Sequence, residues 1–268
     1  MNIAASAPRA AYADLAGKTV LLSGGTTGIG RAAADQFVAQ GSRVINLDIA
    51  TDAAAPFQTI ECDVRDEQAV AAAVSRVAAE TGRLDVVFAN AGISWDRTVS
   101  ETTTDMLRDV LDINLIGVYN LARHGYLVMR ALGMPGAIVL TSSPHAWRTT
   151  ADMSAYAISK AGVLAVANAM AIEGGPHRIR VNSLSPGAVD TPILRREART
   201  TGDEEAALRR WGAVRPAGRV GVPDEIAAGV LFLASEVSSY LTGANLVIDG
   251  GMSAYLGGSM SVTSSEEK

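Results

Sequence analysis

The sequence has few of the side chains that hold a protein together covalently or through a metal ion. It contains one cysteine, Cys62, and three histidines in 268 residues. One cysteine excludes an internal disulfide, and three scattered histidines do not provide the spacing of a metal site. We therefore expect no bound metal and a reducing compartment, the cytoplasm.

An excess of positive charge is also absent. The 23 Lys and Arg residues are outnumbered by 28 Asp and Glu, which gives a formal net charge of -5 at pH 7. A mildly acidic surface does not attract nucleic acid or an anionic membrane. No charge-free apolar run approaches the roughly 18 residues of a membrane span, and residues 1–16 lack the basic start and apolar core of a signal peptide. The remaining partner class is a small molecule.

The sequence does contain short apolar runs that alternate with helical patterns. With 48% hydrophobic residues, the chain is long enough to bury the core of one domain. The apolar runs lack a polar face, which predicts a parallel sheet covered by helices on both sides. We expect strands at 18–23, 43–48, 58–62, 84–89, 137–141 and 178–184, and helices at 31–40, 67–80, 104–132 and 153–172.

This pattern predicts an α/β fold with one doubly wound parallel sheet in a single domain. We expect the domain to span residues 15–257, between a flexible N-terminal arm at 1–14 and a flexible tail at 258–268. Residues 187–216 are the one long irregular stretch, and we expect about 188–216 to act as a substrate lid. In such sheets ligands bind beyond the carboxyl ends of the strands.

A glycine-rich turn lies between the first strand and the first helix. It runs from Gly24 to Gly30 with the spacing G-x-x-x-G-x-G. Such a turn brings bare backbone and the positive end of a helix to a pyrophosphate, although a glycine-rich turn can also serve packing alone. Its place between a strand and a helix favours a dinucleotide.

The end of the second strand indicates which dinucleotide is bound. Asp48 stands where a carboxylate accepts from the adenosine 2′-hydroxyl and repels a 2′-phosphate. Thr27, Ile49 and Ala50 are not basic, so we expect NAD rather than NADP. Arg31 either lies on the solvated face of its helix or permits NADP.

Three residues supply proton chemistry. Tyr156 and Lys160 lie one helical turn apart, and Ser143 follows the neighbouring apolar run. The pKa of a free phenol is about 10, and one positive charge at about 4 Å brings it to about 7. A tyrosinate then takes a proton from an alcohol while Ser143 hydrogen-bonds the same oxygen. This combination predicts one half of a hydride-transfer site.

Other polar residues follow strand ends or interrupt a helix. Asn90-Ala91-Gly92 follows the fourth strand, where a small turn lets a cofactor pass close to the backbone. Asp63-Val64 follows the third, and Asp63 either caps the adenine amino group or caps the next helix. Asn114 lies in a helical run, where it either organises a water molecule or is a buried hydrogen-bonding side chain.

These motifs resemble those of the short-chain dehydrogenase/reductase family over roughly residues 15–252, which implies a Rossmann-type fold. The resemblance rests on the Gly24–Gly30 turn with Ser23 in place of the usual Thr, Asn90-Ala91-Gly92, Asn114, Ser143, Tyr156, Lys160, Pro186-Gly187 followed by Thr191, and Asp249-Gly250-Gly251. It implies that Tyr156 is the acid/base, that Lys160 lowers its pKa and binds the nicotinamide ribose, and that Ser143 positions the reacting oxygen. Asn114, by the same resemblance, holds a water molecule of the proton relay.

The resemblance also implies a set of cofactor contacts. The residues implied to bind NAD are Gly24, Thr27, Gly28, Ile29, Gly30, Asp48, Asp63, Val64, Asn90, Ala91, Gly92, Tyr156, Lys160, Pro186, Gly187, Val189 and Thr191.

All three tryptophans lie in loops at this edge or in the expected lid. The residues expected to touch substrate are Trp95, His145, Trp147, Met153, Leu194 and Trp211. Aromatic surface in such loops favours a bulky apolar ligand, although each tryptophan can merely pack its own loop. No fixed cation is expected beside Ser143, apart from the lid residues Arg195 and Arg196.

These features predict an NAD-dependent alcohol dehydrogenase or ketone reductase for a neutral, bulky secondary alcohol or ketone, cyclic or aryl-substituted. The alternatives are a reductase of a 3-oxoacyl or steroid-like ketone, and a non-catalytic NAD-binding sensor. The helix that carries Tyr156 is apolar around nearly its whole circumference. We therefore expect one side to meet a partner subunit in a homotetramer or homodimer.

Overall fold

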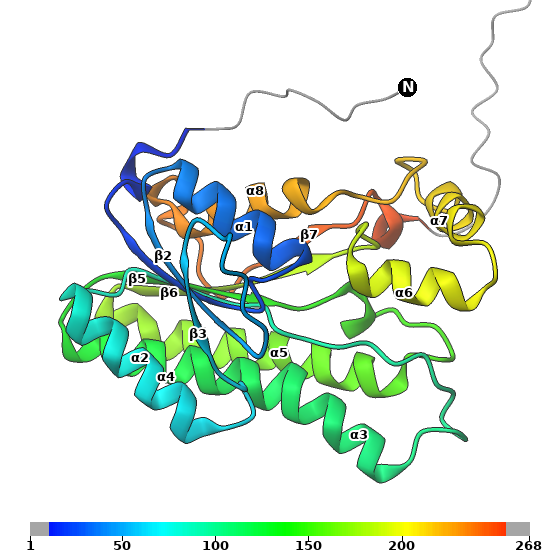
Figure 1. Cartoon of the computed structure of the whole chain (residues 1–268), viewed down its shortest axis with the longest axis horizontal. Helices are drawn as coiled ribbons and strands as arrows, with labels where there is room; N and C mark the ends of the chain where they lie inside the picture. Colours follow the sequence, from blue (N-terminus) through cyan, green and yellow to red (C-terminus); the bar gives the residue numbers. More distant parts are fainter. Residues whose placement is uncertain (1–10, 256–268) are drawn as a thin grey trace, which may run out of the picture.

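The computed structural model describes residues 11–255. Its core is a seven-stranded sheet with parallel neighbours, in the order β3-β2-β1-β4-β5-β6-β7 (Figure 1). The strands are β1 Thr19–Ser23, β2 Arg43–Asp48, β3 Gln58–Glu61, β4 Val86–Ala89, β5 Gly136–Thr141, β6 Ile179–Pro186 and β7 Asn245–Ile248. The strand order reverses between β1 and β4, which places the expected ligand crevice at their carboxyl ends.

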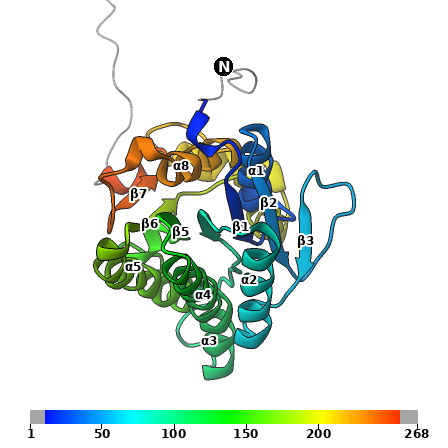
Figure 2. The ribbon, with the colours of Figure 1, turned by 90° about the vertical axis from the view of Figure 1, so that its left-hand side faces the viewer.

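Helices cover both faces of this sheet, as the sequence predicts. They are α1 Gly28–Ala39, α2 Glu67–Thr81, α3 Thr104–Leu111, α4 Val118–Ala131, α5 Ser154–Gly174, α6 Pro192–Thr200, α7 Glu204–Ala213 and α8 Pro223–Ala234. α1 and α8 pack together on one face, and α2, α4 and α5 lie on the other (Figure 2). Because successive strand residues point to opposite faces, Leu21 belongs to one buried cluster and Leu22 to the other. The α/β, doubly wound fold class is confirmed.

Most expected elements form close to their predicted bounds. β2 has the predicted residues, and α2 differs by one residue at its end. α2 begins after Asp66, whose carboxylate accepts from two backbone N–H groups at 2.9 and 3.0 Å, and it ends at Gly82, with φ of 69°. The sequence analysis assigns no structure to the residues of α8 and β7. α8 completes the helix layer that contains α1, and β7 completes the sheet.

The helix expected over 104–132 is not one regular helix. α3 passes into a π-helical segment at Asp112–Gly117, and α4 continues from there. π-Helical turns are rare and are frequent at functional sites. Asn114 lies in this segment.

The irregular conformation expected for 187–216 is wrong, because α6 and α7 occupy most of it. The two helices pack through a small cluster whose members are Leu194, Ala198, Ala207, Leu208 and Trp211. Their function as a lid stays a prediction.

The N-terminal arm expected at 1–14 is partly attached to the domain. Residues 13–15 form a 3-10 turn. The Tyr12 backbone N–H donates to Gln40 Oε1 at 2.7 Å, and the Asp14 carboxylate accepts from the Glu236 N–H at 2.9 Å. Residues 1–10 and the expected tail at 258–268 lie outside the described residues.

Among residues 11–255, one helix is long and apolar enough to cross a membrane by length and composition alone, namely Ser154–His177, which is α5 with the turn after it. A single helix of this kind is weak evidence, because core helices pass the same test. Val163 and Ala167 of α5 are buried in the apolar cluster on the sheet. Packing against the sheet therefore accounts for the apolar character of this side of α5.

Candidate functional site

The glycine turn brings backbone rather than side chains to the end of β1. Gly24 and Gly28 have φ of 70° and 58°, in the region that favours glycine. A Cβ on Gly30 would lie 2.0 Å from the Gly24 carbonyl oxygen, so a side chain there would push α1 away from the turn. Within the described residues Thr27 makes no side-chain cap hydrogen bond to α1, and Ile29 packs against the core. The first N–H groups of α1 therefore fit an anion such as a pyrophosphate.

Asp48 ends β2 beside this turn. Its carboxylate accepts from two backbone N–H groups at 3.1 and 3.2 Å. Arg31 pairs with Asp52 at 2.7 Å and with Asp35 at 2.9 Å, and hydrogen bonds to these two carboxylates raise its pKa. A 2′-phosphate would have to compete with both acidic partners of Arg31 and would also meet Asp48.

Asn90 joins the carboxyl ends of three strands. The Ser23 hydroxyl accepts from the backbone N–H groups of Asn90 and Ala91, each at 3.1 Å. The Asn90 amide donates to the carbonyls of Ser23 and Gly24 at 3.3 Å and accepts from Thr141 Oγ1 at 3.2 Å. These contacts fix the small turn that continues to Gly92, and they need only the hydroxyl of Ser23, which a threonine shares.

The loop after β3 is anchored to α4. The Asn120 side chain donates to the Val64 carbonyl at 3.0 Å, and Val64 is buried. The Asp63 carboxylate pairs with the exposed Arg65 at 2.6 Å, and this hydrogen bond lowers the pKa of Asp63. The cap of α2 is Asp66, so the alternative role of Asp63 as that cap is wrong. Its contact with adenine stays a prediction.

The loop after β6 meets the glycine turn. Pro186 ends β6, and Gly187 packs on the backbone at Asp249. Val189 is buried, and Thr191 caps α6 by accepting from a backbone N–H at 3.3 Å. A Cβ on Gly28 would lie 3.3 Å from the Thr191 methyl carbon. The glycine turn and the loop after β6, which are far apart in sequence, therefore lie side by side.

Ser143, Tyr156 and Lys160 come together at the carboxyl end of β5. Lys160 is 2% exposed, and its Nζ donates to the Thr141 carbonyl at 2.9 Å and lies 5.5 Å from the Tyr156 ring centroid. The Ser143 hydroxyl hydrogen-bonds the Tyr156 phenol. The His145 ring packs edge-on against Tyr156, with 5.8 Å between centroids.

The proton affinities at this site differ from the expected ones. Burial raises the pKa of Tyr156 to about 12, although the hydrogen bond with Ser143 opposes this rise. Burial lowers the pKa of Lys160 to about 8. The expectation that Lys160 brings the Tyr156 pKa near 7 is therefore wrong, because burial of the phenol raises this pKa more than its neighbours lower it.

Asn114 is fully buried in the π-helical segment. Its Oδ1 accepts from the Ile93 N–H at 2.8 Å, and its Nδ2 donates to the Ile93 carbonyl at 2.9 Å and to Ser159 Oγ at 3.3 Å. A Cβ on Gly92 would lie 3.2 Å from Asn114 Oδ1 and 3.7 Å from Lys160 Nζ. Asn114 is therefore a buried hydrogen-bonding side chain, which is one of its two expected roles. It also lies near Lys160, as the other role, in a proton relay, requires.

Glycines let the π-helical segment pack closely on both sides. A Cβ on Gly162 of α5 would lie 2.8 Å from Leu115 Cδ2, and one on Gly117 would lie 2.5 Å from Val64 Cγ2. Asn114 is thereby held between the helix that carries Tyr156 and the loop after β3.

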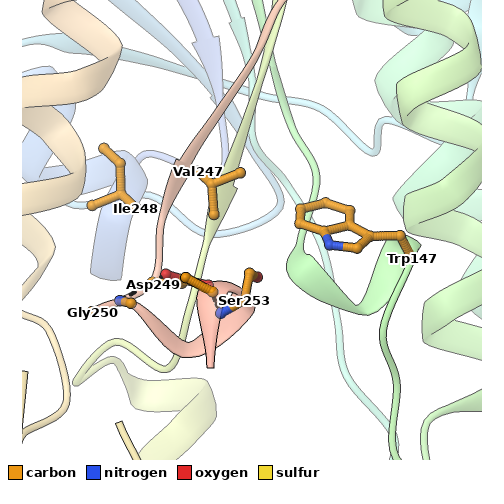
Figure 3. A pocket seen from close by; sticks show the side chains of 8 residues that line it. Trp147, Val247, Ile248, Asp249, Gly250 and Ser253 are labelled. Carbon is orange, nitrogen blue, oxygen red and sulfur yellow. Dashed lines mark hydrogen bonds between the residues drawn. The ribbon is translucent and has the colours of Figure 1, made fainter. Parts of the chain in front are cut away.

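Trp147 and residues 247–254, which include the end of β7, line an open cleft. The Trp147 side chain is 42% exposed and faces Val247 and Ser253 across an opening of about 590 Å³ (Figure 3). His145, two residues earlier, lies 3.0 Å from Thr149 Oγ1 through Nδ1, and burial lowers its pKa. This cleft has room for an apolar substrate group.

The other residues expected to touch substrate have different surroundings. Leu194 and Trp211 pack on the cluster between α6 and α7, as the packing alternative describes. Met153 precedes α5, and its Sδ lies 3.8 Å from Ser94 Oγ. Trp95 is half-buried in the same loop as Ser94.

Polar residues that the sequence analysis does not single out also lie near Tyr156. Glu197 of α6 acts on the phenol through its charge, and burial raises the pKa of Glu197 to about 7. Burial also raises the pKa of Asp96. Arg215 acts on His145 through its charge, and the expectation of no cation beside Ser143 other than Arg195 and Arg196 stays a prediction.

The chain is similar to known proteins over most of its length. Residues 24–253 match a family model described as enoyl-(acyl carrier protein) reductase. Momilactone A synthase of Oryza sativa subsp. japonica is 38% identical, with 89% of this chain and 91% of that protein covered. The 2,5-dichloro-2,5-cyclohexadiene-1,4-diol dehydrogenase of Sphingobium indicum is 35% identical, with 90% and 99% covered. The ligand-free structure of Thermoplasma acidophilum aldohexose dehydrogenase has a TM-score of 0.89 at 34% identity and covers 92% of this chain and 98% of that one.

Proposed function

The chain belongs to the short-chain dehydrogenase/reductase family of oxidoreductases, which act on alcohols and ketones, and we propose that it transfers hydride between NAD(H) and a neutral, bulky secondary alcohol or ketone, cyclic or aryl-substituted. The observation that carries the proposal is the meeting of Ser143, Tyr156 and the buried Lys160 at one strand end. These three residues lie at the same edge of the sheet as the glycine turn that follows β1.

Tyr156 is the group that exchanges a proton with the substrate oxygen. With a pKa of about 12 it carries its proton at neutral pH, and it donates that proton to a ketone oxygen that becomes an alkoxide. Ser143, beside the phenol, donates a hydrogen bond to the same oxygen. In the direction of oxidation Tyr156 must first lose its proton, which the nearby Lys160 ammonium favours.

Lys160 and Asn114 are placed to move that proton onward. The pKa of Lys160, lowered to about 8 by burial, lets the ammonium exchange its proton near neutral pH. Asn114 Oδ1 faces the same glycine as Lys160 Nζ. A water molecule held by Asn114 would connect Lys160 to solvent.

NAD, when bound, accepts or supplies the hydride. The turn at 24–30 fits its pyrophosphate, Asp48 its adenosine ribose, and Tyr156 and Lys160 its nicotinamide ribose. The remaining contacts proposed are Asp63, Val64, Asn90, Ala91, Gly92, Pro186, Gly187, Val189 and Thr191. NAD is favoured over NADP because Arg31 is already held by two carboxylates.

A bulky substrate is favoured by the exposed apolar surface of Trp147, four residues after Ser143. Trp147 presents an exposed ring to the cleft. Two of the relatives, a cyclohexadienediol dehydrogenase and an aldohexose dehydrogenase, are named for ring compounds that carry hydroxyl groups. We therefore place cyclic secondary alcohols first among the substrates.

The proposal is tested by incubating purified protein with NAD or NADP and a panel of alcohols while nicotinamide absorbance is followed. We expect turnover with NAD and bulky cyclic or aryl secondary alcohols, and a kcat/KM for an aryl ketone at least about tenfold above that for a short keto acid. Faster turnover of the keto acid, or of a 3-oxoacyl thioester, would contradict the substrate class. NAD binding without any turnover would indicate the non-catalytic sensor.

We also propose that the chain forms a homotetramer or homodimer. Ile158 and Ile172 of α5 are 52% and 79% exposed, on the side turned away from the sheet. Exposed apolar surface of this kind favours a protein partner, and a second copy is the simplest one. Light scattering at micromolar protein concentration tests this, and a monomer would contradict it.

The cytoplasm is the location we propose. Cys62 is a buried free thiol, and burial raises its pKa, so it stays a packing residue under reducing conditions. Fractionation of the expressing cell would test the location.

A further inference from the structure

One aromatic contact of Tyr156 has no part in the proton relay or in the cofactor contacts. The His145 imidazole packs edge-on against the phenol ring, with 5.8 Å between the ring centroids and 79° between the ring planes. Edge-to-face pairs of aromatic rings at this separation are stabilising. His145 belongs to the 3-10 turn Pro144–Ala146, which packs on α5. The contact therefore joins the loop after β5 to the residue that is proposed to exchange the proton.

The His145 ring is held by its own neighbours. Its backbone N–H donates to Ser143 Oγ at 3.3 Å, and its Nδ1 lies 3.0 Å from Thr149 Oγ1. Burial lowers the pKa of His145, the charge of Asp152 opposes this change and the charge of Arg215 supports it. The ring is thus neutral at pH 7 and acts on Tyr156 through packing rather than through charge.

Tyr156 needs a contact of this kind because α5 fixes only the start of its side chain. Rotation about the side-chain torsions moves the phenol oxygen away from Ser143. The Lys160 ammonium lies 5.5 Å from the ring centroid and donates to the Thr141 carbonyl. Proton transfer requires the phenol oxygen within about 2.6–3.2 Å of the substrate oxygen. A restraint on the ring therefore raises the fraction of molecules that are ready to react.

We infer that His145 is a positioning residue, whose ring holds the Tyr156 phenol beside Ser143 so that both reach the same substrate oxygen. The inference rests on the proposed function and goes beyond it, because it adds a residue that acts through Tyr156. The sequence analysis expects His145 to touch substrate. The two roles predict different kinetics, since a positioning residue changes kcat and a residue that only binds substrate changes KM.

The test separates the ring from its hydrogen bond in three variants, assayed with NAD and the fastest cyclic alcohol of the panel above. His145→Phe keeps a ring against Tyr156, His145→Asn keeps a polar group for Thr149 without a ring, and His145→Ala keeps neither. Loss of an edge-to-face pair predicts that kcat falls about three- to tenfold in the Asn and Ala variants and by less than about twofold in the Phe variant. KM and NAD affinity should stay within about twofold of wild type.

The pH profile of kcat is a readout that a merely structural role would not move. The hydrogen bond with Ser143 lowers the pKa of Tyr156. A phenol that leaves Ser143 loses this effect, so the alkaline limb of alcohol oxidation should move to higher pH in the Asn and Ala variants of His145. It should stay in place in the Phe variant. Lys160 and Glu197, the charged groups that also lie near the phenol or act on it through their charge, are the same in all variants.

His177→Ala is the matched control, because His177 makes a similar edge contact with Tyr126 of α4, at 6.2 Å and 73°. It should leave kcat and the pH profile unchanged. The Phe and Asn variants alone decide the test if the Ala variant has a lowered thermal melt.

Three results would overturn the inference and leave the proposed function standing. They are a wild-type kcat and pH profile in the ring-free variants of His145, a higher KM with unchanged kcat, and an equal loss of kcat with and without a ring at this position. No turnover of any alcohol by wild type overturns both.

Discussion

The expected cofactor side of this site consists mainly of backbone groups, whereas the expected substrate side consists mainly of side chains. On the cofactor side, left-handed glycines, a helix start and the Asn90 amide set the geometry through the backbone. On the expected substrate side, charged side chains come from α6 and the loop after β4, and burial raises the pKa values of Glu197 and Asp96. Short motifs therefore specify where NAD is expected, whereas contacts between distant segments specify what is expected to react with it.

The largest effect is expected where the two sides meet. Tyr156→Phe removes the proton donor but leaves the backbone of the cofactor side intact. We expect kcat to fall by about two to four orders of magnitude with NAD affinity nearly unchanged, as measured by steady-state kinetics and NAD titration. Tyr126→Phe, which removes another buried phenol on α4, is the matched control. More than a tenth of wild-type activity in the Tyr156 variant would refute its role.

A pH experiment measures how strongly the site is buried. Burial lowers the Lys160 pKa from 10.5 to about 8, so between these pH values the unfolded chain binds more protons than the folded one. The free energy of unfolding should therefore rise with pH across this window, by about 3 kcal/mol from Lys160. Urea unfolding of wild type and Lys160→Met, at one protein concentration, should show a difference that grows in favour of wild type from pH 8 to pH 10.5. A constant difference would mean that the ammonium is well solvated.

The geometry of the expected cofactor side is disrupted most directly by a substitution that displaces its backbone. A Cβ on Gly30 would lie 2.0 Å from a carbonyl oxygen, so Gly30→Ala must displace the turn. We expect a loss of about 1–3 kcal/mol in the free energy of unfolding and weaker NAD binding. Gly175→Ala is the control, because a Cβ there meets nothing within 4 Å and φ is -49°. Equal stability of the two variants would show that the turn relaxes freely.

The smallest expected change concerns which dinucleotide is used. Asp48→Ala combined with Ile49→Arg exchanges a negative charge for a positive one at the end of β2. We expect the ratio of kcat/KM for NADP to that for NAD to rise about tenfold or more, in low-salt buffer. Asp105→Ala, which removes an acid that is 89% exposed on α3, should leave the ratio unchanged. A wild type that already prefers NADP would refute the electrostatic argument and direct attention to Arg31.

The strands and the meeting of Ser143, Tyr156 and Lys160 were predictable because they depend on local patterns. β2 has its predicted bounds, since an apolar run between Gly41 and a terminal carboxylate leaves little choice. Tyr156 and Lys160 needed only helical spacing to share a face. The glycine turn needed only its place between a strand and a helix.

The helices α6 and α7 were missed because their sequences are dominated by charge. Arg195, with Asp190 and Glu204, stabilises α6 and α7 through ion pairs between segments, which no local pattern reveals. A weaker signal was present in the apolar spacing of Leu194 with Ala198 and of Ala207 with Trp211, which matches the cluster between the helices.

The raised pKa values of Tyr156 and Glu197 were beyond local reasoning for a different reason. Both depend on burial, and burial at this edge is created by β5, α5 and α6 together. The sequence places Glu197 in a charged run and says nothing about which member of that run faces inward.

The π-helical segment at Asp112–Gly117 divides the helix that runs from residue 104 to 131 into two phases. A π-turn closes its hydrogen bond one residue later than an α-turn, so each extra residue rotates the rest of the helix by about 100°. α3 accordingly packs on α5, whereas α4 packs on α2, β4 and β5. Deletion of one residue from 112–117 would restore ordinary helical pitch but turn one half of the helix out of step with its neighbours. We therefore expect this segment to tolerate substitutions better than insertions or deletions.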